Sequence, residues 1–92
     1  MKGEMDPAVA GELQDLLKAG YAALRKGDLA GAGQRCQRAL DIKADLVPAH
    51  FLVGLVALEG KDRKTAFSAF KTVVKLDPDH GAAWAHLAKL YM

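Results

Sequence analysis

The sequence lacks the features that mark several large classes of protein. It has one cysteine, Cys36, so it cannot form an internal disulfide, and a lone thiol in so short a chain favours a reducing, cytoplasmic setting. Its longest apolar run, from Ala49 to Leu58, contains His50 and is about half of the roughly 20 residues that a membrane-spanning helix needs. Residues 1–7 contain no apolar stretch of the kind that a secretory signal requires. We therefore expect a soluble chain with no membrane partner.

Excess charge and aromatic residues are also scarce. The net charge of +2 is too small to indicate a nucleic-acid partner. Lys64, Lys71 and Lys75 share one helix face, but no aromatic side chains are interleaved with them to stack on bases, so we interpret them as a solvated surface. Few aromatic residues combined with plentiful alanine favour close-packed helices over a sheet core. We expect no nucleic acid to bind.

Patterns typical of catalytic and metal sites are missing as well. The histidines His50, His80 and His86 have no Cys, His, Asp or Glu three or four residues further along a helix, so they lack metal-ligand spacing. The only serine, Ser68, lies in the middle of a predicted helix, and Cys36 falls at a predicted core position, which favours packing over nucleophilic chemistry. We predict no catalytic residues, no metal and no cofactor, and hence no enzyme activity in this chain.

A period of 34 residues organises the sequence. When the chain is shifted by 34 positions, matching residues coincide at the small or apolar positions that a packed helix pair would need. The identical pairs are Gly20/Gly54, Ala23/Ala57, Leu24/Leu58, Asp28/Asp62, Ala32/Ala66 and Asp45/Asp79. The period predicts a flexible N-terminus and one repeat domain, with the boundaries 1–6 for the N-terminus, 7–92 for the domain, 13–46 and 47–80 for the two repeats, and 81–92 for a half repeat.

Helix-ending and helix-capping residues divide each repeat into two helices. Gly27 and Gly60 are candidates for the left-handed residue that ends a helix, and Pro48 suits the first turn of one. The candidate N-caps are Asp6, Asp28 and Asp62, with Asp45 and Asp79 at the repeat junctions. Together with apolar residues at helical spacing, these signals predict helices at about residues 7–26, 29–43, 46–59, 63–76 and 80–92.

A helix–turn–helix unit of this length resembles the tetratricopeptide repeat. The positions that carry the resemblance are Val53-Gly54, Ala66, Phe70 and Pro78 in the second repeat, Ala19-Gly20, Ala32 and Cys36 in the first, and Trp84, Leu87-Ala88 and Tyr91 in the half repeat. The chain departs from the family pattern at His50, where a larger residue is usual, and at Ala23 and Ala57, where tyrosine is usual. The resemblance covers residues 13–92 and implies an all-α fold, an α-α superhelix of five antiparallel helices in about two and a half repeats.

The resemblance also implies a binding surface. In this family the first helix of each pair lines a concave groove that holds peptide segments. The positions carried over are Gln14, Leu17, Tyr21, Leu24, Phe51, Leu55, Leu58, Ala82, Ala85 and Lys89. A chaperone-binding subfamily has polar groups where Leu17, Tyr21 and Leu55 stand, so we expect an apolar groove and no clamp for a terminal carboxylate. The alternative is that these side chains only pack against neighbouring helices.

The last predicted helix leaves an apolar end. In the family a further helix would cover Trp84, Leu87 and Tyr91, so we expect a longer parent protein, and self-association of this chain through these residues. The stretches 49–55 and 82–88 look like the N-terminal repeats of bacterial repeat-containing sulfotransferases, and repeat-containing glycosyltransferases are a second candidate. The sequence predicts a protein-interaction module for an unidentified peptide or protein segment. The alternatives are a self-assembly element and the docking or regulatory arm of a larger transferase.

Overall fold

The computed structural model describes residues 6–91, and every regular element in that range is a helix. The helices are α1 (Pro7–Arg25), α2 (Leu29–Ile42), α3 (Val47–Glu59), α4 (Arg63–Leu76) and α5 (Gly81–Tyr91). These bounds confirm the predicted helices to within one residue at each end, with Met92 outside the described range. The predicted flexible N-terminus also lies outside that range, except for Asp6, which caps α1.

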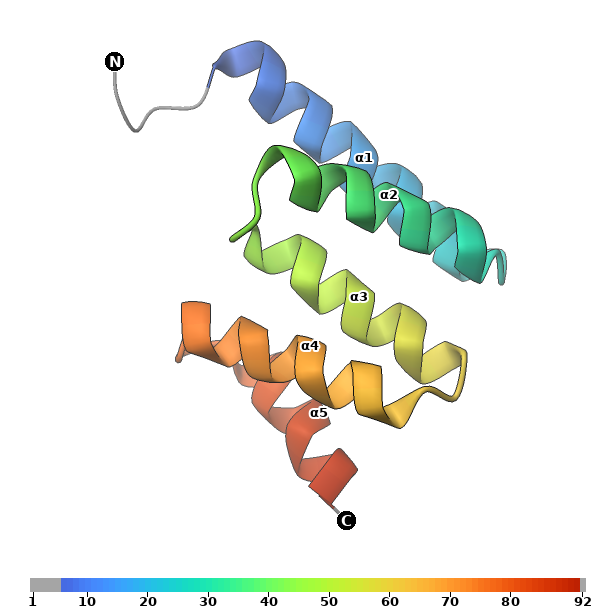
Figure 1. Ribbon diagram of the computed structural model, residues 1–92, viewed down its shortest axis with the longest axis vertical. Helices are drawn as coiled ribbons and strands as arrows, with labels where there is room; N and C mark the ends of the chain where they lie inside the picture. The colour runs from blue at the N-terminus through green and yellow to red at the C-terminus, as the bar shows by residue number, and fades with distance from the viewer. Residues whose placement is uncertain (1–5, 92) are drawn as a thin grey trace.

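The helices form two antiparallel pairs followed by a single helix (Figure 1). α1 packs along α2, and α3 packs along α4, while α3 also contacts both helices of the first pair. α5 packs on α4, so α1 and α5 lie at opposite ends of a body that measures 45 × 30 × 17 Å. This is the all-α superhelix that the resemblance to the tetratricopeptide repeat implies.

Small residues let the paired helices approach closely. Ala32 and Ala66 are fully buried, and beside them Cys36 and Phe70 fill the space between the helices of each pair. The larger apolar cluster joins the second pair to α5; its buried members are Ala57, Ala66, Phe70, Val73, Ala83 and Leu87. A smaller cluster lies between the first pair and α3; its buried members are Leu13, Leu16, Ala39 and Ala49. Because the side chains of each cluster come from consecutive helices, the clusters hold the repeats in one stack.

The caps within the repeats are confirmed, whereas those predicted at the repeat junctions are wrong. The carboxylates of Asp28 and Asp62 accept hydrogen bonds from the backbone N–H groups of Gly31 and Thr65, at 2.9 and 3.1 Å. Each aspartate directly precedes its helix, which brings its carboxylate to the first free N–H groups. Asp45 and Asp79 lie one residue too early, because the residues next to the helices are Leu46, which makes no side-chain cap, and His80.

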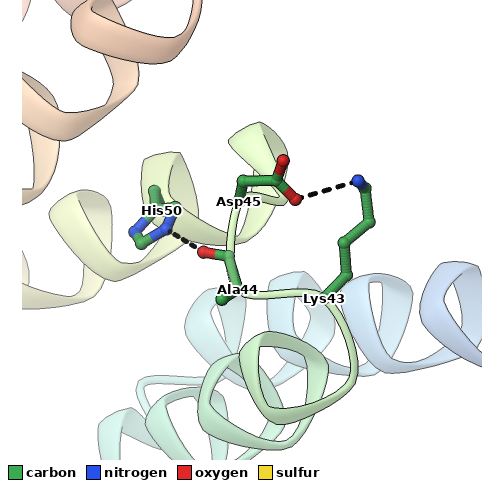
Figure 2. A network of polar contacts seen from close by, with 4 residues as sticks. All are labelled: Lys43, Ala44, Asp45 and His50. Carbon is green, nitrogen blue, oxygen red and sulfur yellow. Dashed lines mark hydrogen bonds and ion pairs between the residues drawn. The ribbon is translucent and has the colours of Figure 1, made fainter. Parts of the chain in front are cut away.

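Other polar contacts hold the repeat junctions. Figure 2 shows the first junction, where the Nζ atom of Lys43 lies 2.9 Å from the Oδ1 atom of Asp45, and the Nε2 atom of His50 donates to the Ala44 carbonyl at 2.8 Å. At the second junction the Nδ1 atom of His80 accepts from the backbone N–H of Ala83 at 3.1 Å, so a histidine caps α5. His50 and His80 therefore have structural partners in the turns.

The turn residues of the two repeats differ. Gly27 takes the left-handed conformation with φ of 83°, as predicted. Gly60 does not, since its φ is −84°, and Lys61 takes the left-handed conformation instead with φ of 65°. Lys61 is the residue that lies 34 positions after Gly27, so the backbone keeps the repeat register even where the glycine has moved by one position.

Candidate functional site

The predicted groove residues lie in rows across α1, α3 and α5, the first helices of the repeats. Each row is a set of positions 34 or 68 residues apart: Leu17, Phe51 and Ala85; Tyr21, Leu55 and Lys89; Leu24 and Leu58; and Gln14 and Ala82. None of these side chains is fully buried. Gln14, Ala82, Ala85 and Lys89 are exposed, and the six larger apolar residues are half-buried. The surface therefore offers accessible apolar groups at repeat-equivalent positions.

A shallow hollow of about 600 Å³ lies over α1. Its lining residues are Gln14, Leu17, Lys18, Tyr21 and Arg25. Three of these were predicted as groove residues, whereas Lys18 and Arg25 were missed. Both follow a predicted groove residue by four positions, which places them on the same helix face, so helical spacing alone could have found them. The hollow combines an apolar floor with two cationic side chains.

Tyr21 is the aromatic residue that lines this hollow. It is half-buried, and that burial raises the pKa of its phenol, with the Cys36 thiol as a smaller contribution. The hydroxyl group therefore stays protonated at neutral pH and can donate a hydrogen bond to a ligand. Tyr21 thus offers both a ring and a donor.

The α3 residues of the surface also take part in packing. Phe51, Leu55 and Leu58 contact the larger apolar cluster with part of each side chain. The Phe51 ring lies edge-on to the Phe70 ring at 5.5 Å between centroids, and its centroid is 4.9 Å from that of His80. Because these side chains are only half-buried, they contribute to the core on one side and to the accessible surface on the other.

His86 joins α5 to the second repeat. Its ring stacks on Phe70 with centroids 4.8 Å apart and an angle of 8° between the planes, and it lies 5.8 Å from Phe51. Burial lowers the pKa of His86, and the charge of Lys89 lowers it further. This role could not be predicted from the sequence, because a histidine on an apolar helix face does not reveal which ring it meets.

The apolar end of α5 differs from the prediction in one residue. Trp84 and Tyr91 are exposed, with 50% and 73% of their surface accessible, but Leu87 is only 2% exposed. Leu87 is a buried member of the larger cluster and cannot belong to an exposed surface, because the face of α5 that carries it packs on α4. Trp84 donates from its Nε1 atom to the Pro78 carbonyl at 2.7 Å, and Tyr91 lies edge-on to Phe67 at 5.3 Å.

Two adjoining hollows of about 280 and 260 Å³ lie between α2, α3 and α4. Both are lined by Gln37, Val53 and Thr65, and their lining contains no lysine or arginine. Cys36 lines the first of them but is only 1% exposed, and burial raises the pKa of its thiol to about 11. The thiol is therefore protonated at neutral pH and is a poor nucleophile.

Some kinds of site are absent from the described part of the chain. Within residues 6–91, no group of three or more His, Cys, Asp or Glu side chains is arranged to hold a metal ion. None of the five helices in that range has the length and apolar character to cross a membrane.

Comparison with known proteins gives matches to helical-repeat proteins. No family model matches the chain. It is 31% identical over 80 residues to the human Superkiller complex protein 3 and 29% identical over 80 residues to Tetratricopeptide repeat protein 37 of Xenopus laevis. Each match covers 87% of this chain but only 5% of the relative's length.

A solved structure matches as well. A mutant of the Thermobaculum terrenum O-GlcNAc transferase superposes with a TM-score of 0.85 and 28% identity, over 94% of this chain and 16% of that one. The match covers only the repeat portion of the transferase. The chain therefore has the fold of tetratricopeptide-repeat proteins and is similar to them in sequence, and these relatives imply a helical-repeat module for protein interaction.

Proposed function

We propose that this chain holds a peptide or protein segment in an apolar groove formed by the first helices of its repeats. The observation that supports this most is the half-burial of apolar side chains at repeat-equivalent positions. These are Leu17, Tyr21 and Leu24 of α1 and Phe51, Leu55 and Leu58 of α3. Phe70, by contrast, is fully buried in the core. Accessible apolar groups that cluster in rows are typical of a surface that meets a partner.

The fold suits such a role because the rows are fixed before any partner arrives. Phe51, Leu55 and Leu58 are anchored in the larger cluster, so their accessible sides need little further ordering on binding. A partner that covers them gains about 25 cal/mol for each Å² of apolar surface removed from water, without a large loss of side-chain entropy. We therefore expect the preferred segment to be rich in leucine, isoleucine or aromatic residues.

A display library of short random peptides, selected on the immobilised 92-residue chain, tests this proposal. The selected peptides should be rich in large apolar residues. One of them is then titrated against Tyr21→Ser in the hollow and against Ile42→Ser, a matched control at a 39% exposed position of α2. We expect binding to weaken by about tenfold or more in the first variant and to be unchanged in the second. Failure to select any peptide, or equal effects of the two variants, would contradict the proposal.

A second candidate function is the docking or regulatory arm of a larger transferase. The similarity to the repeat portion of an O-GlcNAc transferase supports a glycosyltransferase parent. A sulfotransferase parent is supported only by the stretches 49–55 and 82–88. Reading the coding sequence beyond residue 92 tests both, because a transferase domain there would establish the arm. The continuation of the repeats without such a domain would contradict it.

Self-assembly is a third candidate, and Trp84 and Tyr91 support it. They lie seven residues apart on one face of α5, where a second copy of the chain could cover them. Light scattering after size exclusion should then show a dimer that Tyr91→Ser weakens. A monomer at every concentration would remove this candidate. We propose a cytoplasmic location for the module, which the single cysteine favours.

A further inference from the structure

We propose that the segment held over α1 is acidic as well as apolar, and that Lys18 and Arg25 select it. This inference rests on the proposed function, since it names the chemistry of the partner at the same surface. Its starting point is the composition of the hollow over α1. Leu17 and Tyr21 supply apolar contact, Lys18 and Arg25 supply two positive charges, and no carboxylate lines it. A ligand that complements this surface carries negative charge next to a large apolar group.

Both cations are available to a partner. Among residues 6–91 the one ion pair joins Lys43 to Asp45, and no hydrogen bond within that range involves the Lys18 or Arg25 side chain. Asp15 lies three residues before Lys18 but does not line the hollow and forms no ion pair with it. Arg63 is different, because it donates to the Leu90 carbonyl at 3.0 Å and so has a structural role.

The second repeat has no cations at the positions equivalent to Lys18 and Arg25. The residues 34 positions after Lys18 and Arg25 are Leu52, which is fully buried, and Glu59, which has the opposite charge. The acidic part of the segment should therefore lie over α1, and its apolar part should continue over Phe51 and Leu55 of α3. The sign change from Arg25 to Glu59 gives the bound segment a preferred direction.

The surfaces on α2, α3 and α4 differ from the hollow over α1 as binding sites for an acidic segment. The hollows between α2, α3 and α4 have no lysine or arginine in their lining, so they offer no cation to an acidic segment. The solvated lysines of α4 are cationic, but they line none of the three hollows described above. On α4, Lys71 already lies over the Phe67 ring, 5.6 Å from its centroid, whereas Lys18 and Arg25 line a hollow together with Leu17 and Tyr21. Tyr21 can add a hydrogen bond from its hydroxyl group to a carboxylate there.

The experiment compares three fluorescent peptides with the same leucine and phenylalanine residues. Their remaining positions carry glutamate, glutamine or lysine, and each peptide is titrated against the full 92-residue chain by anisotropy. We expect the glutamate peptide to bind about tenfold more tightly than the lysine peptide, with the glutamine peptide between them. Added salt should reduce this difference, because it screens charges at an exposed site.

Two charge-reversed variants show where the selection takes place. Lys18→Glu combined with Arg25→Glu should invert the order, so that the lysine peptide binds best. Lys64→Glu combined with Lys75→Glu changes the net charge by the same amount on α4, and it should leave the order unchanged. Inversion of a preference cannot result from partial unfolding, which would weaken all three peptides.

The outcomes separate this inference from the proposed function. If the glutamine peptide binds as well as the glutamate peptide, the inference is wrong and the apolar groove stands. If no peptide binds, the proposed function fails, and the inference fails with it. A single-stranded oligonucleotide that binds more tightly than a glutamate peptide of equal charge, and loses its binding in the Lys18/Arg25 double variant, would reassign the two cations to a nucleic-acid partner.

Discussion

Gly54 of α3 lies so close to Phe70 of α4 that a single added carbon would collide with the ring. A Cβ atom built on Gly54 would lie 2.5 Å from Cζ of Phe70 and within 3.0 Å of two further ring atoms. The Phe70 side chain is fully buried and stacked on His86, so it has little room to move. The spacing of the second helix pair, and with it the position of Phe51 and Leu55 on the surface, depends on this contact.

We predict that Gly54→Ala lowers the free energy of unfolding relative to Gly11→Ala. Both glycines lie inside helices, where alanine is normally favoured by about 1 kcal/mol, and a Cβ on Gly11 would meet nothing within 4 Å. Overpacking against Phe70 should therefore separate the two variants by about 1–3 kcal/mol in urea unfolding. Equal stabilities would show that α3 and α4 are further apart than the structure has them.

The turn between α3 and α4 gives a prediction in the opposite direction. Lys61 has φ of 65°, a conformation that costs a residue with a side chain about 1–2 kcal/mol and costs glycine almost nothing. Lys61→Gly removes this cost, but part of the resulting stabilisation is lost because glycine has more conformational freedom in the unfolded chain. We expect a net stabilisation of about 0.5–1 kcal/mol in urea unfolding.

Gly27→Ala serves as the matched control, because Gly27 holds the left-handed position of the first repeat with φ of 83°. It should lose stability where Lys61→Gly gains it, and open space around Gly27 leaves backbone strain as the cause. If Lys61→Gly were destabilising, the left-handed conformation at this turn would be in doubt.

The two turns also show how much of the fold could be predicted from the sequence. The period, the helical spacing and the caps Asp28 and Asp62 predicted the five helices, because these signals can be found along the chain without knowing how the helices pack. The left-handed residue was placed at Gly60 on residue type, although the repeat register pointed to Lys61. Asp45 was likewise expected to cap α3 because of its residue type. A capping residue must directly precede its helix, and α3 begins one residue later than predicted, so Asp45 is one position too early.

The binding surface could be predicted only in part. The resemblance led to the apolar positions of α1 and α3, and it gave no reason to look at Lys18 or Arg25. Leu87 was grouped with Trp84 and Tyr91 because α5 is apolar on several sides. Which side packs on α4 is decided by neighbouring helices far away in the sequence. Helical periodicity gives the faces of a helix but not the neighbour that each face meets.

The buried thiol of Cys36 should report on the opening of the first helix pair. It is 1% exposed with a pKa of about 11, against 9.0 for an accessible thiol, so the thiolate fraction at neutral pH falls by about a hundredfold. We expect a thiol reagent to label the native chain at least about a hundredfold more slowly than the chain in denaturant. Rapid labelling of the native chain would mean that α1 and α2 separate readily.

The pH dependence of stability should depend on His86. Its pKa in the folded chain is below the 6.5 of an accessible histidine, mainly because the ring is partly buried, so the unfolded chain binds more protons as the pH falls below about 6.5. Protonation therefore favours unfolding in the window between that value and the lowered pKa. About one pH unit above 6.5 the ring is almost fully neutral in both states and no longer affects the pH slope.

We predict that the melting temperature of the wild-type chain falls between about pH 7.5 and pH 5.5, and that His86→Phe makes this fall shallower. Phenylalanine keeps a ring over Phe70 but cannot bind a proton, and it removes the unfavourable encounter of an imidazolium with Lys89. His50 and His80 are present in both proteins, so the difference between the two pH profiles belongs to His86 alone. Parallel profiles would mean that the His86 ring is as accessible to water in the folded chain as in the unfolded one, and that α5 is not held against Phe70.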